Sequence, residues 1–135
     1  MRLFAVLLVA GLVAVAGASA KPIGPGDVLV CGASRCRAVD EPAQARALSE
    51  LLWGSGRVVR AATPRVGSAV YQLHARTRHG HQPLGAAVNA TSIRVHGLNC
   101  GRFRRGKWYR LPAALRGFTS GLSPKRLTVV VPRSC

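Results

Sequence analysis

The chain has 135 residues and a formal net charge of +16, because 20 Lys and Arg stand against only 4 Asp and Glu. This length fits one domain and is too short for two comfortable ones. All four acids lie between Asp27 and Glu50, which leaves little scope for an enzyme built on paired carboxylates. Residues 51–135 hold 15 Lys or Arg and no acid. We therefore expect those cations to face water or an anionic partner.

The first twenty residues have the pattern of a secretory signal peptide. Arg2 supplies a positive start, residues 3–16 are apolar, and Ala18-Ser19-Ala20 is a small-residue cleavage site. An uncleaved membrane anchor is the alternative, since residues 3–20 carry no charge and are just long enough to span a bilayer. The small residues favour cleavage after Ala20. We expect a secreted or extracytoplasmic chain without a transmembrane segment, made of a flexible leader at 21–26 and a single domain at 27–135.

The cysteines predict a disulfide framework, because an even number in a short exported chain is typical of one. Residues 27–31 and 36–39 read as two strands joined by a tight turn, which places Cys31 opposite Cys36 at bridging distance. Of the three possible connectivities we favour Cys31–Cys36 with Cys100–Cys135. A thioredoxin-like redox pair would need two intervening residues, and a zinc site would need a second close cysteine pair. We expect no cofactor and no metal.

The segment Val-Cys-Gly-Ala-Ser-Arg-Cys-Arg-Ala-Val at residues 30–39 follows closely on the expected signal peptide. It resembles the C-G-x-S-x-C start of short exported proteins from high-GC Gram-positive bacteria, which end in a basic segment containing Trp. The resemblance covers the start of the chain well and the rest loosely. It implies export, and it implies no activity.

One main helix is expected after the first hairpin. Asp40 is placed to cap it, Pro42 fits its first turn, and Gly54 ends it after Trp53. The helix carries an apolar stripe at helical spacing, which predicts core packing rather than a partner-binding face: Ala45, Leu48, Leu51 and Leu52.

Further strands are predicted from alternating polarity. We expect a strand over 68–75, a polar loop over 76–85, and a second strand over 86–96 with Thr91, Ile93 and Val95 on one face. Shorter elements are expected at 57–61 (strand), 112–116 (helical turn) and 125–131 (strand with Leu127, Val129 and Val131 inward). The sum is an α+β fold with a small antiparallel sheet, one main helix and disulfide bridges.

The basic loop, residues 102–110, is the densest chemical feature of the sequence. Cations of this kind contact phosphate and other anions, and Arg can engage two oxygens at once. We expect the loop cations to bind an anion: Arg102, Arg104, Arg105, Lys107 and Arg110. Trp108 and Tyr109 could stack on bases or sugars. The alternative is that they are core anchors, which is favoured in a chain with only two Trp.

Four histidines leave room for other chemistry. His79 and His81 could supply two metal ligands with His74 or His96 as a third, but histidines in a polar loop are usually solvated. A small secreted phosphodiester hydrolase could use one His as base and another as acid, with Lys or Arg stabilising the transition state. We expect instead an exported cationic domain that binds a cell-wall polymer, an anionic lipid surface or a nucleic acid. That hydrolase, and a structural domain without a specific ligand, are the alternatives.

Overall fold

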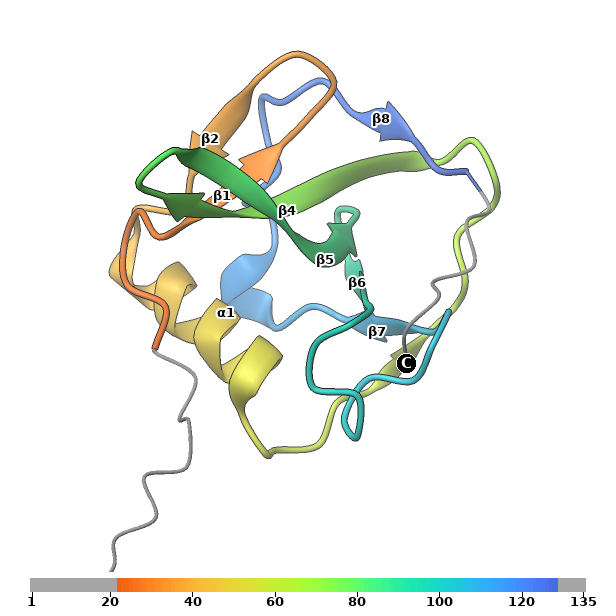
Figure 1. Ribbon diagram of the computed structural model, residues 1–135. Helices are drawn as coiled ribbons and strands as arrows, with labels where there is room; N and C mark the ends of the chain where they lie inside the picture. Colours follow the sequence, from red (N-terminus) through yellow and green to blue (C-terminus); the bar gives the residue numbers. More distant parts are fainter. Residues whose placement is uncertain (1–21, 129–135) are drawn as a thin grey trace, which may run out of the picture.

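The computed structural model describes residues 22–128, which form an antiparallel sheet with one main helix (Figure 1). This confirms the predicted fold class, including the Cys31–Cys36 disulfide. Strand order along the sheet is β2-β1-β4-β5-β6-β7-β3, and β8 pairs with β4 beside this path. The described strands are β1 (Val28–Cys31), β2 (Cys36–Ala38), β3 (Arg60–Ala61), β4 (Ala69–Thr77), β5 (Gly80–Val88), β6 (Ser92–Val95), β7 (Trp108–Arg110) and β8 (Lys125–Arg126).

The β1–β2 hairpin opens the described fold, as the sequence predicted. Cys31 lies directly opposite Cys36 in its register, with their Cα atoms 4.0 Å apart. The guanidinium of Arg37 donates to the carbonyl oxygens of Ser120 and Phe118, which joins the hairpin to a segment more than eighty residues later. The predicted Cys100–Cys135 bridge and the signal peptide involve residues outside the described range.

Helix α1 spans Pro42–Trp53, and its four predicted stripe residues are all buried. The predicted cap is wrong, because Glu41 rather than Asp40 precedes the first helical turn and makes no side-chain cap bond. Proline explains this start: its fixed φ suits the first helical position, and it has no amide hydrogen that a cap would need to satisfy. Before the helix, the amide of Ile23 donates to the hydroxyl of Ser49 at 3.1 Å.

The expected polar loop over 76–85 is instead most of a long hairpin between β4 and β5. Its strands turn at Arg78 and His79, and the register shifts at Leu73 and His74. Gly85 takes a φ of +69° within β5, where a Cβ would lie 2.4 Å from the carbonyl oxygen of His96. An irregularity of this kind accommodates Pro and Gly inside a strand, because the normal ladder is interrupted there.

The expected strand over 86–96 is also divided. β5 ends at Val88 and β6 begins at Ser92, so residues 89–91 form a turn. The side-chain oxygen of Asn89 accepts bonds from the amides of Thr91 and Ser92 at 2.9 and 2.7 Å, which is the pattern of an Asx turn. Ile93 and Val95 are buried as expected, whereas Thr91 is exposed in the turn.

The sheet carries apolar clusters on both faces. The larger cluster joins the helix stripe to the inner faces of the strands, with Leu73, Val88 and Leu115 fully buried. A smaller cluster on the opposite face holds Trp108 and Leu127. The predicted helical turn is a short 3-10 helix at Ala113–Leu115, and the predicted last strand is seen at Lys125–Arg126 with Leu127 buried. The expected inward positions Val129 and Val131 lie outside the described residues.

Within residues 22–128, no helix is long and apolar enough to cross a membrane.

Candidate functional site

The basic loop begins with an arginine that is held by the fold. The guanidinium of Arg102 donates to the backbone oxygens of Gly56 and Glu50, the second at 3.3 Å. Its guanidinium carbon also lies 5.9 Å from the centroid of the Phe103 ring. Arg102 therefore ties the loop to the end of helix α1 and to the segment that follows it.

The aromatic side chains of the loop are core residues. Phe103, Trp108 and Tyr109 are 1%, 2% and 4% exposed. The rings of Phe103 and Tyr109 meet edge to face at 5.3 Å, and the Tyr109 hydroxyl accepts the amide of Arg104 at 2.8 Å. These rings offer no platform on which a base or sugar could stack, so the core-anchor interpretation of the aromatics is the correct one.

The remaining loop cations divide into two groups. Arg104, Arg105 and Lys107 are exposed around the turn at Gly106, whose φ is +70°. Arg110 lies at the end of strand β7, opposite Ser92 of β6. The structure therefore separates Arg110 from the turn and places it among arginines from elsewhere in the chain.

Four arginines line a hollow of about 510 Å³, which we call the arginine cleft: Arg60, Arg65, Arg110 and Arg116. Strand β3 brings the first of them beside β7, because Arg60 pairs with Tyr109 and Ala61 with Trp108. The hydroxyl-bearing residues Thr63, Thr91 and Ser92 complete much of the lining. Guanidinium groups and hydroxyls together form a set of donors suited to phosphate or sulfate oxygens.

Within the described residues, no acidic side chain compensates the charges of the arginine cleft. None of its lining residues is acidic. Among residues 22–128, these four arginine side chains have no hydrogen-bond acceptor or carboxylate partner, and their one recorded contact places Arg60 over the Tyr109 ring at 5.7 Å. Four uncompensated positive charges around one hollow attract anions, and the concave shape concentrates that field.

Arg110 also lines a second hollow of about 440 Å³, together with Arg57 and Arg102. Arg57 and Arg102 in turn line a third hollow of about 610 Å³, beside the half-buried Trp53. Because neighbouring hollows share lining residues, the basic surface continues from the arginine cleft past Arg110 to the end of helix α1. Glu50 is the one acid in the second hollow.

Two of the histidines meet on a different part of the sheet. The Nδ1 atoms of His74 and His81 lie 2.7 Å apart, across the β4–β5 hairpin, and their ring centroids are 4.6 Å apart. Burial lowers the pKa of His74 below its ordinary value, and the charges of His81 and Lys125 lower it further. Neither His74 nor His81 lines the arginine cleft.

The other two histidines stand apart from this pair. His79 is exposed in the hairpin turn. His96 lies in the chain after β6, where burial lowers its pKa and the nearby charge of Arg94 lowers it further. The disfavoured alternative of a metal site with His79 and His81 as ligands is not what the hairpin forms, since His81 contacts His74 and His79 is exposed.

Sequence reasoning identified one residue of the arginine cleft, Arg110, and missed the other three. Arg60, Arg65 and Arg116 are spread over more than fifty positions and form no local motif. The one available signal was the complete lack of acids after residue 50, which marks the whole region as cationic without locating a site in it.

Comparison with known proteins gives no match of any of three kinds: no protein-family model, no curated protein and no solved structure is similar enough to this chain to assign it a family.

Proposed function

We propose that this protein is an exported cationic domain whose arginine cleft binds an anionic polymer of the cell wall, of the phosphate-linked polyol type. The observation that carries the proposal is the convergence of Arg60, Arg65, Arg110 and Arg116 on one hollow without an acid among its lining residues. The expected signal peptide supports a partner outside the membrane.

A polymer is favoured over a small anion because the basic surface continues beyond the arginine cleft. Arg110 borders two hollows, and the second leads to Arg57 and Arg102. A chain of repeating negative charges could engage several of these arginines at once. Each contact between an arginine and a phosphate would release counterions from the polymer. A single phosphate would use only one of the hollows.

A wall polymer is favoured over the other anionic partners that the sequence left open. Single-stranded nucleic acid is usually held by aromatic stacking, and the rings of the basic loop are buried in this fold. A lipid surface would suit cations on a flat or convex face, whereas these arginines surround hollows. Duplex DNA is the strongest remaining competitor, because backbone phosphates alone bind clustered arginines.

Binding to a glycerol-phosphate polymer tests the proposal, with heparin, duplex DNA and anionic vesicles as comparison ligands. The cleft variant Arg65→Gln with Arg116→Gln removes two exposed cleft charges. The loop variant Arg104→Gln with Arg105→Gln removes the same charge from the turn. We expect the cleft variant to bind the polymer more weakly on the order of tenfold, and the loop variant to stay near the parent. Equal binding by both variants would overturn the proposal, and tighter binding to DNA or vesicles would reassign the partner.

A histidine-dependent phosphodiester hydrolase is the second candidate, and the contact between His74 and His81 is the observation that favours it. A general base and a general acid must reach opposite sides of the reacting phosphorus. Here the two Nδ1 atoms face each other at hydrogen-bond distance, which leaves no room for a substrate between them in this arrangement. Incubation with a dinucleotide and with the wall polymer tests the candidate: product release that His74→Gln abolishes would support hydrolysis over binding.

A further inference from the structure

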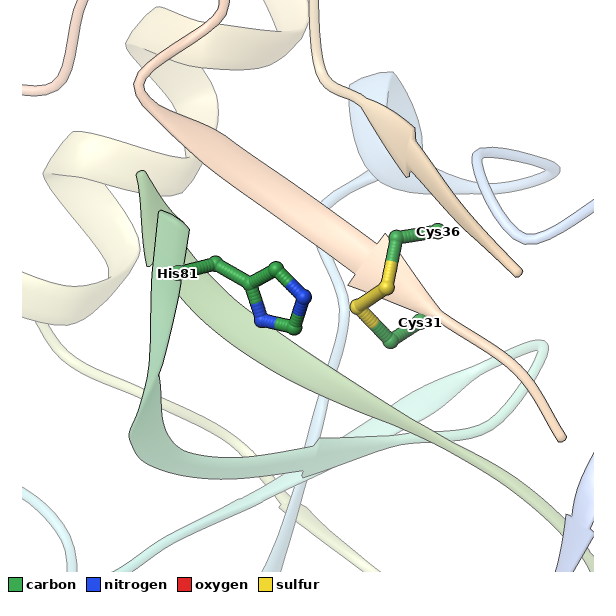
Figure 2. Close-up of side chains that lie close together, drawn as sticks. All are labelled: Cys31, Cys36 and His81. Atoms are coloured by element: carbon green, nitrogen blue, oxygen red, sulfur yellow. A yellow bond between two sulfur atoms is a disulfide. The ribbon is translucent and has the colours of Figure 1, made fainter. Parts of the chain in front are cut away.

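The outer face of the sheet brings together two cysteines and two histidines that no part of the binding proposal uses. One ligand atom from each of Cys31, Cys36 and His81 lies within 4.8 Å of the other two. Figure 2 shows the His81 ring directed toward the disulfide. His74 lies outside this set of three and contacts it through His81, with the two Nδ1 atoms 2.7 Å apart.

Strand order explains why four residues from distant parts of the sequence meet. Cys36, Cys31, His74 and His81 belong to β2, β1, β4 and β5, which are consecutive neighbours in the sheet. Cys31 pairs with Gln72, so His74, two residues further along β4, projects from the same face. His81 pairs with Arg76, which again shares the face of His74. One hairpin supplies the two sulfurs and the next supplies the two imidazoles.

We propose that reduction of the Cys31–Cys36 disulfide converts this group into a four-ligand site for Zn²⁺, with two thiolates and two imidazoles. Such a ligand set is that of structural zinc sites, and a C-x4-C spacing is within the range they use. Sequence reasoning rejected zinc because a second cysteine pair is lacking, but histidines can take that place. In tetrahedral coordination, with zinc bonds of about 2.0–2.3 Å, neighbouring ligand atoms lie roughly 3.3–3.8 Å apart. Three of the four ligands already lie within 4.8 Å of one another. Closure around a metal requires the two sulfurs to separate on reduction and the His74 ring to move toward them, because His74 lies outside that set of three.

A phosphine can reduce the Cys31–Cys36 disulfide to the two thiols, with all atoms and electrons accounted for. The phosphine gives two electrons to the disulfide and becomes its oxide, while water supplies the oxygen and the two protons that form the thiols. Zn²⁺ then displaces the two thiol protons, since thiolate is the metal-binding form. In the oxidised chain the sulfurs are bonded to each other and cannot act as thiolate ligands, so the disulfide and the metal are alternative occupants of one site.

Cobalt spectroscopy of the full chain tests the proposal. After phosphine reduction, Co²⁺ should give sulfur-to-cobalt charge-transfer bands and the visible bands of tetrahedral coordination, and Zn²⁺ should displace it. His74→Gln and His81→Gln should each weaken Co²⁺ binding on the order of a hundredfold. His79→Gln is the matched control, because His79 is exposed in the same hairpin and lies outside the cluster. Cys100 is present in the parent and in every variant. Any metal bound through it therefore contributes equally to all of them and does not change the comparison.

A second measurement keeps the test decisive if reduction loosens the fold. Alkylation of each cysteine by iodoacetamide, mapped by mass spectrometry, should be slowed by Zn²⁺ at Cys31 and Cys36 in the parent and in His79→Gln. That protection should be lost in His81→Gln. A reduced chain without charge-transfer bands would overturn the proposal, as would His74 and His81 variants that bind Co²⁺ like the parent or keep the same alkylation protection. None of these ligands lines the arginine cleft, so failure here leaves the polymer-binding proposal untouched.

Discussion

The guanidinium of Arg94 lies over the ring of Trp108 at 5.5 Å from its centroid. The two residues face each other across the β6–β7 pair. Trp108 is 2% exposed, and burial lowers the pKa of Arg94. Trp108 of the basic loop is thus a core residue in the smaller apolar cluster. Its ring packs against the guanidinium of Arg94 on the neighbouring strand β6.

Replacing Trp108 should therefore destabilise the fold rather than disable a binding surface. Trp108→Ala removes a fully buried ring, which typically costs about 3–5 kcal/mol of the free energy of unfolding. Trp53→Ala is the matched control, since Trp53 is only half-buried, and it should cost clearly less. Chemical denaturation followed by circular dichroism measures both. A folded Trp108→Ala with parental stability would contradict the burial described above.

The bridges should differ in their value to stability. Replacing both Cys31 and Cys36 by serine removes a bridge that closes a very short loop. This should lower the free energy of unfolding by about 2 kcal/mol in the chain-entropy model. Serine at both Cys100 and Cys135, whose pairing stays a prediction, should cost about 4 kcal/mol because that loop is longer. Denaturant titration of the two double variants compares them, and peptide mapping without reduction checks the pairing. A larger cost for the first pair would argue against this loop-length explanation.

Stability should fall as the solution becomes mildly acidic. The pKa values of His96 and His74 are lowered in the folded chain from an ordinary value of 6.5. Below pH 6.5 the unfolded chain therefore binds more protons than the folded chain, so the free energy of unfolding decreases as the pH falls toward the folded pKa values. His96→Gln should flatten this dependence between pH 7.5 and 5.5, as followed by denaturant titration at each pH. A parent whose stability does not change over this range would contradict the expectation.

Several elements could be predicted because their residues carry a local pattern. The β1–β2 hairpin and helix α1 were anticipated from alternation, a tight turn and an apolar stripe. The β4–β5 hairpin was not, because its polar residues project outward and Pro83 and Gly85 normally argue against a strand. The irregular register near Leu73 accepts both residues, and no short sequence pattern announces such a bulge.

The site residues also differ in how far the sequence could predict them, because some form a local run and others meet only through long-range strand pairing. The cation density of residues 102–110 was visible, yet the fold commits Arg102 to backbone oxygens and directs Arg110 into the arginine cleft. The cleft itself arises from the pairing of β3 with β7 across nearly fifty residues. Contacts at that separation depend on strand order, which composition and spacing do not specify.

Arg110 should be the most sensitive single position for polymer binding, because it lines two neighbouring hollows. Arg110→Gln should weaken binding to the glycerol-phosphate polymer more than Arg105→Gln does, although both remove one exposed charge. Isothermal titration at fixed salt compares the two variants, and unfolding curves confirm that both remain folded. Equal losses would mean that total charge, not the position of Arg110, controls affinity.

The salt dependence of polymer binding tests the central claim most directly. Each phosphate that an arginine neutralises releases counterions and adds roughly 0.7–0.9 to the slope of log affinity against log salt. If the four cleft arginines engage the glycerol-phosphate polymer, the slope for the parent should be about −3 or steeper. Arg65→Gln with Arg116→Gln should flatten it by about one to two units, and Arg104→Gln with Arg105→Gln should change it by less than about half a unit. A loop variant that flattens the slope as much as the cleft variant would contradict the assignment of binding to the arginine cleft.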